Sequence, residues 1–359
     1  MGRRAVCAAL IACVAGCGST VVGPFPASVA PPGSGSASPV VTVGSPRPSP
    51  SPAPTVGGRW VSAGTLAHPR FTATAVLLDD GTVLVPDGAF AGAHSDNGAI
   101  DGPERFDPVS ATWSAVAPIG ARRGGGTVTR LADGRVLVAG GFVDGRVTAS
   151  AVIFDPRTGR WAKTGSLAAT RTQQAAVALG DGRVLVVGGI SDVQDDTLGG
   201  LATVELFDPA TGRWTSGPPL PAGRVGGTAT LLADGRVLVA GGSTTLAALH
   251  REVGAEIFDP VTGRWTATGD MPVGLTFETA TLLADGRVLV AGGDGIGTGA
   301  SESSAELFDP ATGRWQTAAA MTEGRAAATA VRLADGSVLV VGGVADLLGM
   351  LGSAERFTP

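Results

Sequence analysis

The stretch LADGRVLVAGG at residues 131–141 decides the fold, because variants of it occur six times along the chain. Its Asp133-Gly134 pair predicts a two-residue hairpin turn, since both positions of such a turn favour positive φ. The strand Val136-Leu137-Val138 that follows is apolar at consecutive positions, so neither of its faces suits contact with water. We therefore expect a sheet protein whose strands are covered on both sides.

A tryptophan stands at a fixed distance from this stretch in every copy. Each tryptophan precedes the Asp-Gly glycine by 21 residues, and the copies recur about every 50 residues. A Phe-Asp-Pro element, as at Phe154-Asp155-Pro156, supplies a further turn. The period predicts propeller blades of four antiparallel strands, with the tryptophans packed in the core. The tryptophans are Trp60, Trp113, Trp161, Trp214, Trp265 and Trp315.

The double glycine after a hydrophobic strand, followed by a tryptophan downstream, resembles the kelch repeat. The Val-Leu-Val strand with Gly-Gly and Phe-Asp-Pro is also similar to the central propeller of galactose oxidase relatives. The resemblance covers about Arg59 to Pro359 and implies an all-β, six-bladed kelch β-propeller with four antiparallel strands per blade. The last copy stops at Pro359 while an unpartnered strand surrounds Trp60, so we expect the N-terminal strand to close the last blade.

The N-terminal segment predicts export and anchoring. Residues 1–16 have a basic start and a short apolar run, which is typical of a signal peptide. The end of that run resembles the lipobox of bacterial lipoproteins, which implies lipidation of Cys17 and a place on the outer side of the cell membrane. An ordinary signal peptide is the alternative. Residues 17–57, rich in Pro, Gly and Ser, predict a disordered tether, and residues 58–359 the propeller.

Composition excludes several classes of function. The formal net charge of −5 gives no reason to bind nucleic acid, so the expected membrane contact is the lipid anchor alone. The three cysteines lie within residues 7–17, so we expect no disulfide framework and no thiol chemistry. Tyrosine is absent, whereas galactose oxidase copper chemistry and sialidase chemistry both depend on tyrosine. We expect no cofactor and no metal site.

All length variation falls between the second and third strands of each copy, so we expect variable loops on one face to carry recognition. Eleven residues before the Asp-Gly glycine, five copies have arginine, and these side chains are predicted to surround the mouth of the central channel. They would suit a carboxylate or phosphate ligand. Alternatively, each caps its own loop or pairs with an acid of a neighbouring blade. The arginines are Arg70, Arg123, Arg171, Arg224 and Arg325.

The fifth copy departs from this pattern, with Leu275 in the arginine position and Phe277 and Glu278 close behind it. We count Phe277 and Glu278 among the candidate ligand-binding residues. Third-strand glutamates recur in five copies, which favours a role as arginine partners over catalysis. They are Glu104, Glu205, Glu256, Glu306 and Glu355.

These observations favour a binding or interaction module, with a protein, a glycan or an anionic ligand at the loop face. The alternative is a sugar-modifying enzyme similar to the sialic acid mutarotase, another kelch propeller. That resemblance implies that Arg123, Arg171 and Glu278 could bind a sugar carboxylate and move a proton. A flat loop-lined face would favour the module, and a deep pocket around an acid and two arginines would favour the enzyme.

Overall fold

The computed structural model describes residues 59–67, 70, 74–88, 102–121, 123–192, 199–245, 254–295, 301–345 and 349–359. The predicted signal peptide, Cys17 and the predicted tether lie outside these residues, as do large parts of the variable connections. Across the described ranges the secondary structure is all β, and no helix is long and apolar enough to cross a membrane.

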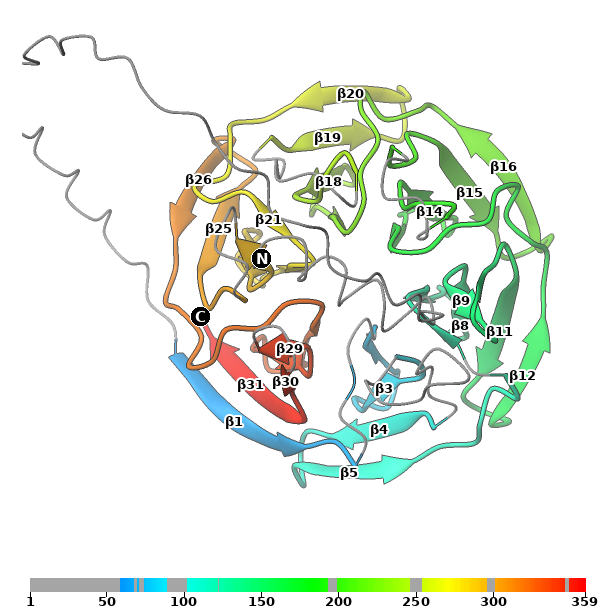
Figure 1. Ribbon diagram of the computed structural model, residues 1–359, viewed down its shortest axis with the longest axis horizontal. Coiled ribbons are helices and arrows are strands. Elements are labelled where there is room, and N and C mark those ends of the chain that lie inside the picture. Colours follow the sequence, from blue (N-terminus) through cyan, green and yellow to red (C-terminus); the bar gives the residue numbers. More distant parts are fainter. Residues whose placement is uncertain are drawn as a thin grey trace, which may run out of the picture.

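The described residues form six four-stranded antiparallel sheets, numbered here 1 to 6 in chain order. Figure 1 shows them arranged around a central axis, with the fourth strand of each sheet at the rim. Sheets 1 to 3 are β2 (Val76–Leu77), β3 (Val83–Val85), β4 (Glu104–Asp107), β5 (Thr112–Ala115); β7 (Thr127–Arg130), β8 (Val136–Ala139), β11 (Ala151–Asp155), β12 (Arg160–Lys163); and β13 (Ala175–Ala178), β14 (Val184–Val187), β15 (Val204–Asp208), β16 (Arg213–Gly217).

Sheets 4 to 6 repeat the same order. They are β17 (Thr228–Leu231), β18 (Val237–Ala240), β19 (Glu256–Asp259), β20 (Arg264–Ala267); β22 (Thr279–Leu282), β23 (Val288–Ala291), β25 (Ala305–Asp309), β26 (Arg314–Thr317); and β27 (Thr329–Arg332), β28 (Val338–Val341), β31 (Ser353–Thr358), β1 (Arg59–Thr65). Short strands flank the inner ends: β6 (Arg123–Gly124), β9 (Phe142–Val143), β10 (Arg146–Val147), β21 (Leu275–Thr276), β24 (Asp294–Gly295), β29 (Val344–Ala345) and β30 (Gly349–Met350).

The two ends of the described chain meet in sheet 6. Strand β1 pairs antiparallel with β31, and Trp60 lies opposite Phe357 in the register. Figure 1 shows this as the blue strand against the red one. This is the pairing that the sequence predicts, and it leaves β31 no open edge on that side.

The core lies between neighbouring sheets. Leu131 and Leu137 of the sheet 2 repeat pack against Val184 and Val186 of sheet 3, and Trp214 covers the cluster from the rim. Equivalent clusters join every neighbouring pair of sheets, including sheets 6 and 1. The second strands read Val-Leu-Val without alternation because each of their faces packs against another sheet.

The Asp-Gly turns differ from the two-residue hairpin that the sequence predicts. The Leu131 amide donates to the Arg135 carbonyl at 2.7 Å, and the Gly134 amide donates to the Leu131 carbonyl at 3.0 Å. Of the loop residues 132–134, Gly134 has a positive φ, of 84°, and Asp133 does not. The loop therefore has three residues, a β-turn followed by a left-handed glycine. The Asp133 carboxylate favours this form because it accepts the Arg135 amide at 3.0 Å.

Four of the fourth-strand tryptophans connect two neighbouring sheets. Trp214 packs on Phe207 across the strands of its own sheet, with 4.9 Å between the ring centroids. Its indole Nε1 donates to the carbonyl of Gly165, in the connection from the preceding sheet, at 2.9 Å. Trp161, Trp265 and Trp315 make the same kind of bond to that connection. These four tryptophans thus pack on the core and also link neighbouring sheets.

Candidate functional site

The five candidate arginines lie within their own sheets, where they are at most 5% exposed. Each donates from Nη1 to the backbone carbonyl of the residue that ends the second strand region, at the first position of the double glycine. The acceptors are Asp87 for Arg70 (3.2 Å), Gly140 for Arg123 (2.7 Å), Gly188 for Arg171 (2.9 Å), Gly241 for Arg224 (2.6 Å) and Gly342 for Arg325 (2.8 Å).

Four of these arginines also form ion pairs with the third-strand glutamates. Arg171 contacts Glu205 at 2.6 Å, and the pairs Arg70–Glu104, Arg224–Glu256 and Arg325–Glu355 are equivalent. The acid comes from the same sheet, not from a neighbouring blade. Burial acts to lower the pKa of Arg171, and the Glu205 carboxylate opposes that effect. This placement favours a structural role for the arginines.

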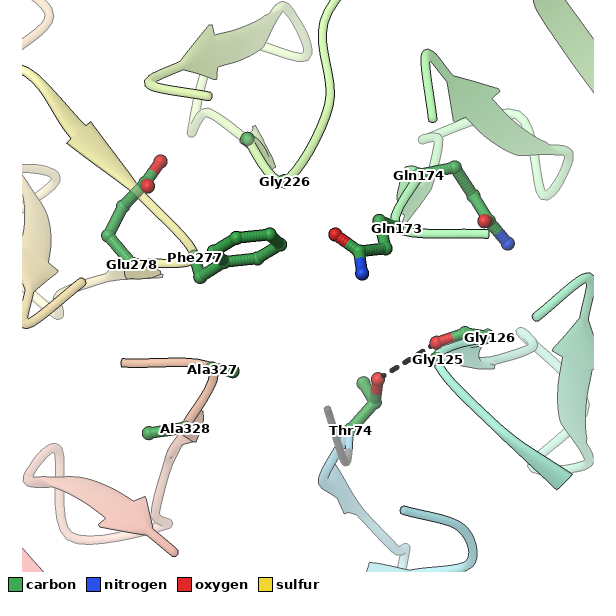
Figure 2. A pocket seen from close by; sticks show the side chains of 11 residues that line it. Thr74, Gly125, Gly126, Gln173, Gln174, Gly226, Phe277, Glu278, Ala327 and Ala328 are labelled. Carbon is green, nitrogen blue, oxygen red and sulfur yellow. Dashed lines mark hydrogen bonds between the residues drawn. The ribbon is translucent and has the colours of Figure 1, made fainter. Parts of the chain in front are cut away.

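A cavity of about 130 Å³ lies where the inner ends of the sheets meet. Its lining comes from the positions two and three residues after the arginine position, together with Thr74 of sheet 1. Among the described residues, the lining includes none of the five arginines, but it does include both Phe277 and Glu278 (Figure 2). The lining residues are Thr74, Gly125, Gly126, Gln173, Gln174, Gly226, Gly227, Phe277, Glu278, Ala327 and Ala328.

Backbone hydrogen bonds run from sheet to sheet around this cavity. The amide of Gln173 donates to Gly125 (3.1 Å), Gly226 to Gln173 (3.0 Å), Phe277 to Gly226 (2.7 Å) and Ala327 to Phe277 (2.8 Å). All five residues are left-handed, with φ between 51° and 69°. A left-handed residue turns its amide and carbonyl sideways, toward the adjacent sheets. The mouth of the channel is therefore built on a chain of inter-sheet bonds.

Two side chains extend into this cavity from opposite sides. Figure 2 shows the Phe277 ring and the Gln173 amide pointing toward one another. The equivalent position holds glycine in sheets 2 and 4, and Ala327 in sheet 6. A side chain at positive φ costs about 1 kcal/mol or more, a cost that glycine avoids. Gln173 and Phe277 therefore carry a backbone cost that Gly125 and Gly226 do not.

Gln174 and Glu278 lie in the next layer, against the double glycine of the preceding sheet. Gln174 Nε2 donates to the Ala139 carbonyl at 2.9 Å. Glu278 is 6% exposed, and its carboxyl group lies beside Gly241. Figure 2 shows this carboxyl directed away from the Phe277 ring. The same layer thus holds an amide in sheet 3 and a carboxyl group in sheet 5.

Asp87 adds a second buried acid near the cavity, at the position of the first glycine. Its Oδ1 accepts the Thr74 amide at 3.3 Å, and burial raises the pKa of its carboxyl group to about 7. The Asp87 side chain has room at this position because the next sheet, sheet 2, has Gly126 there. At the position equivalent to Gly126, sheets 3 and 5 have the larger residues Gln174 and Glu278. Over the residues that the structure describes, His, Cys, Asp and Glu form no group suited to a metal ion.

The variable connections leave the sheets beside this cavity. The residue after each double glycine pairs with the residue that precedes the left-handed position: Phe142 with Gly124, Asp294 with Thr276, and Val344 with Ala326. The stems of the variable loops therefore flank the cavity. Residues 89–101, 193–198, 246–253, 296–300 and 346–348 of these connections lie outside the described residues.

The sequence pattern predicted Phe277 and Glu278 as candidate site residues, but not Gln173, Gln174 or Thr74. A signal was present, because the position two residues after the arginine holds Gly, Gln, Gly, Phe and Ala in sheets 2 to 6. Variation at one position of an otherwise regular repeat marks a surface that packing does not dictate.

Comparison with known proteins agrees with this geometry. The Kelch motif model matches residues 125–167 and 171–221. A comparison with curated protein sequences gave no match. The solved structure of YjhT is similar, with a TM-score of 0.66 and 17% identity, over 80% of this chain and 95% of that one.

A fungal alcohol oxidase of the AA5 family, solved in complex with copper, is also similar. Its TM-score is 0.59 and its identity 18%, over 84% of this chain and 76% of that one. Identities this low establish the fold and not the chemistry. Together, the motif match, the inter-sheet core and the structural similarity support a kelch-repeat β-propeller fold.

Proposed function

We propose that this kelch-repeat β-propeller is a binding module with six blades, and that it holds a neutral polar ligand in the cavity at the inner ends of its sheets. The main support for this proposal is the placement of Gln173 and Phe277. Both side chains point into the cavity from left-handed positions that glycine fills in sheets 2 and 4. Backbone strain retained at a cavity is a feature of binding sites.

The chemistry of the lining supports a neutral ligand. An amide such as that of Gln173 can both donate and accept hydrogen bonds, and the ring of Phe277 offers a flat apolar face. The five arginines are engaged within their sheets, so the lining in the described structure presents no cation to an anionic ligand. With about 10–15 Å³ needed per water site, the cavity has room for a group of roughly ten non-hydrogen atoms.

Glycine substitution separates binding from stability at this site. We expect Gln173→Gly to melt at the same or a higher temperature, because it relieves about 1 kcal/mol of backbone strain. It should at the same time abolish saturation-transfer NMR signals from a panel of small neutral sugars that includes xylose. Ala327→Gly is the matched control, since it relieves the same strain without removing a polar group. Equal signals from the two variants would refute the site.

The alternative function is a sugar-modifying enzyme of the sialic acid mutarotase type. The buried carboxyl of Glu278 in the cavity lining is the observation that favours it, as a group able to carry a proton. NMR of anomer exchange in N-acetylneuraminate tests this function. Exchange accelerated by the native protein and lost in Glu278→Gln would support the enzyme over the module.

The location of the protein in the cell is part of the same proposal. Cys17, at the end of a lipobox-like run, would anchor the propeller to the outer side of the membrane through residues 17–57. Labelling with a radioactive fatty acid should mark the native chain and leave Cys17→Ala unlabelled. Equal labelling of both chains would refute the anchor.

A further inference from the structure

Arg123, the repeated arginine of sheet 2, lacks the third-strand glutamate that the equivalent arginines of sheets 1, 3, 4 and 6 contact. Val152 takes the glutamate position in β11, because it pairs with Val138 just as Glu205 pairs with Val186 in sheet 3. In sheets 1, 3, 4 and 6 the arginine Nη2 contacts a glutamate carboxylate. Within the described ranges, no carboxylate lies within ion-pair distance of Arg123.

The guanidinium of Arg123 is nevertheless held as in the other sheets. Nη1 donates to the carbonyls of Gly140 (2.7 Å) and Ser150 (3.3 Å), and Nη2 donates to Ser150 Oγ (2.8 Å). Arg325 makes the same three contacts, and it adds the carboxylates of Glu355 at 2.9 Å and Glu323 at 3.5 Å. Sheet 2 therefore keeps the backbone and serine contacts of the guanidinium and lacks its carboxylate acceptors.

A buried charge without a charged partner is costly. Arg123 is 3% exposed, and burial lowers the pKa of its guanidinium. Asp87 of sheet 1 opposes that effect through space, but it is not within ion-pair distance. A carboxylate beside Nη2 would remove this cost, as the glutamates do in the other sheets.

The carboxylate position in the other sheets has a second donor. In sheet 3 the Ala168 amide, three residues before the arginine, donates to Glu205 at 2.8 Å. Sheets 1 and 6 have the same bond. In sheet 2 the residue equivalent to Ala168, three positions before Arg123, is Gly120, and Ala121 follows it.

The connection before Arg123 lies at the protein surface. Gly120 is exposed and Ala121 is half-buried, as are their counterparts Ala168 and Ala169 in sheet 3. Val152 is half-buried, whereas the glutamates of sheets 1, 3 and 6 are buried. The left-handed Gly120, with φ of 82°, also sets this connection apart from its counterparts. A small solute can therefore reach the region beside Arg123 from outside.

We propose that sheet 2 binds the carboxylate of a small solute beside Arg123, in the position that the third-strand glutamate occupies in the other sheets. The carboxylate oxygens accept hydrogen bonds from Arg123 Nη2 and from the amides of the connection at Gly120 and Ala121. A planar guanidinium matches two carboxylate oxygens well, which favours a carboxylate over a spherical anion. None of these residues lines the central cavity, so the site is distinct from the proposed binding cavity.

Acetate is the probe, compared with chloride at constant ionic strength. Acetate at ten times its dissociation constant should raise the Tm of the native protein by about 3 °C. Val152→Glu is the matched control: it should raise the Tm without acetate and abolish the response, because it supplies the carboxylate from the chain. An equal acetate response in the native protein and in Val152→Glu would overturn the proposal.

Two further variants keep the test decisive. Arg123→Met should lose the response, and a retained response would also overturn the proposal. Glu205→Val provides an independent test in case Arg123→Met does not fold. It should create a second acetate-responsive site, in sheet 3. No added response in Glu205→Val would count against the shared geometry. None of these outcomes depends on sugar binding at Gln173, so this proposal and the proposed function can fail separately.

Discussion

The repeated arginine shows how one side chain holds a sheet together. It reaches from the start of the inner strand to the carbonyl at the end of the second strand, and then to a glutamate on the third. Sheets 2 and 5 break this arrangement in opposite ways. Sheet 2 has Arg123 but Val152 in the glutamate position, whereas sheet 5 has Glu306 but Leu275 in the arginine position. Each break leaves one buried group whose charge the sheet does not neutralise.

Glu306 makes stability depend on pH. It is 1% exposed, burial raises the pKa of its carboxyl to about 7, and its Oε1 accepts the Val273 amide at 3.0 Å. In the unfolded chain the same group titrates near its ordinary value of 4.5. Between these values the folded state binds more protons, so the free energy of unfolding falls as pH rises through this window, by about 3 kcal/mol in total.

Glu306→Gln should flatten that part of the profile of Tm against pH, because the amide does not titrate. Leu275→Arg should flatten it as well, by supplying the guanidinium found in the other sheets. The Asp87 carboxyl, with its pKa also raised to about 7, adds a slope of the same sign. The difference between the native profile and that of Glu306→Gln isolates the effect of Glu306. Identical profiles would mean that Glu306 does not titrate in this window.

At the scale of the element, the double glycine allows sheets to approach closely. A Cβ added to Gly188, which has a φ of 68°, would lie 2.5 Å from the Arg224 carbonyl oxygen of the next sheet. The adjacent Gly189 donates its amide to that same carbonyl at 2.7 Å. The second glycine thus bonds to the next sheet, and the first must stay small for that bond to form.

Gly188→Ala should therefore destabilise the propeller by about 2–5 kcal/mol, through left-handed strain and steric overlap together. Gly159→Ala separates the two causes, since Gly159 has a φ of 66° and open space around its would-be Cβ. It should cost about 1–2 kcal/mol. Urea unfolding of both variants provides the measurement, and equal losses would contradict the packing explanation.

At the scale of the whole molecule, stability depends on closing the ring of sheets. Strand β1 supplies the fourth strand of sheet 6, and Ala63 and Leu66 pack into the core between sheets 6 and 1. Because every core cluster is shared by two sheets, loss of one junction exposes apolar surface on both.

Deletion of residues 58–66 should lower the Tm of the whole propeller. A chain that begins at residue 58 is the reference, so that both proteins lack the N-terminal 57 residues. Burying a side chain such as Leu66 is worth about 1.5–3 kcal/mol, and the deletion also exposes the edge of β31. A thermal melt that the deletion leaves unchanged would contradict closure by β1.

The sequence alone determined the repeat, the four strands of each sheet and the pairing of β1 with β31. These follow from local patterns: Val-Leu-Val needs cover on both faces, and the segment around Trp60 has the pattern of a fourth strand without three preceding strands of its own. The pattern also predicted the glutamates as arginine partners. Such features depend on residue type and spacing, which a sequence displays directly.

Only the tertiary structure decided which residues face the central cavity. The arginine side chains fold back over their own sheets, and the residue two positions later is left-handed. A left-handed residue interrupts the alternation of a strand, so counting by twos from Arg171 does not predict that Gln173 points to the axis. That conformation is set by hydrogen bonds to the neighbouring sheets, which form only when the sheets stand side by side.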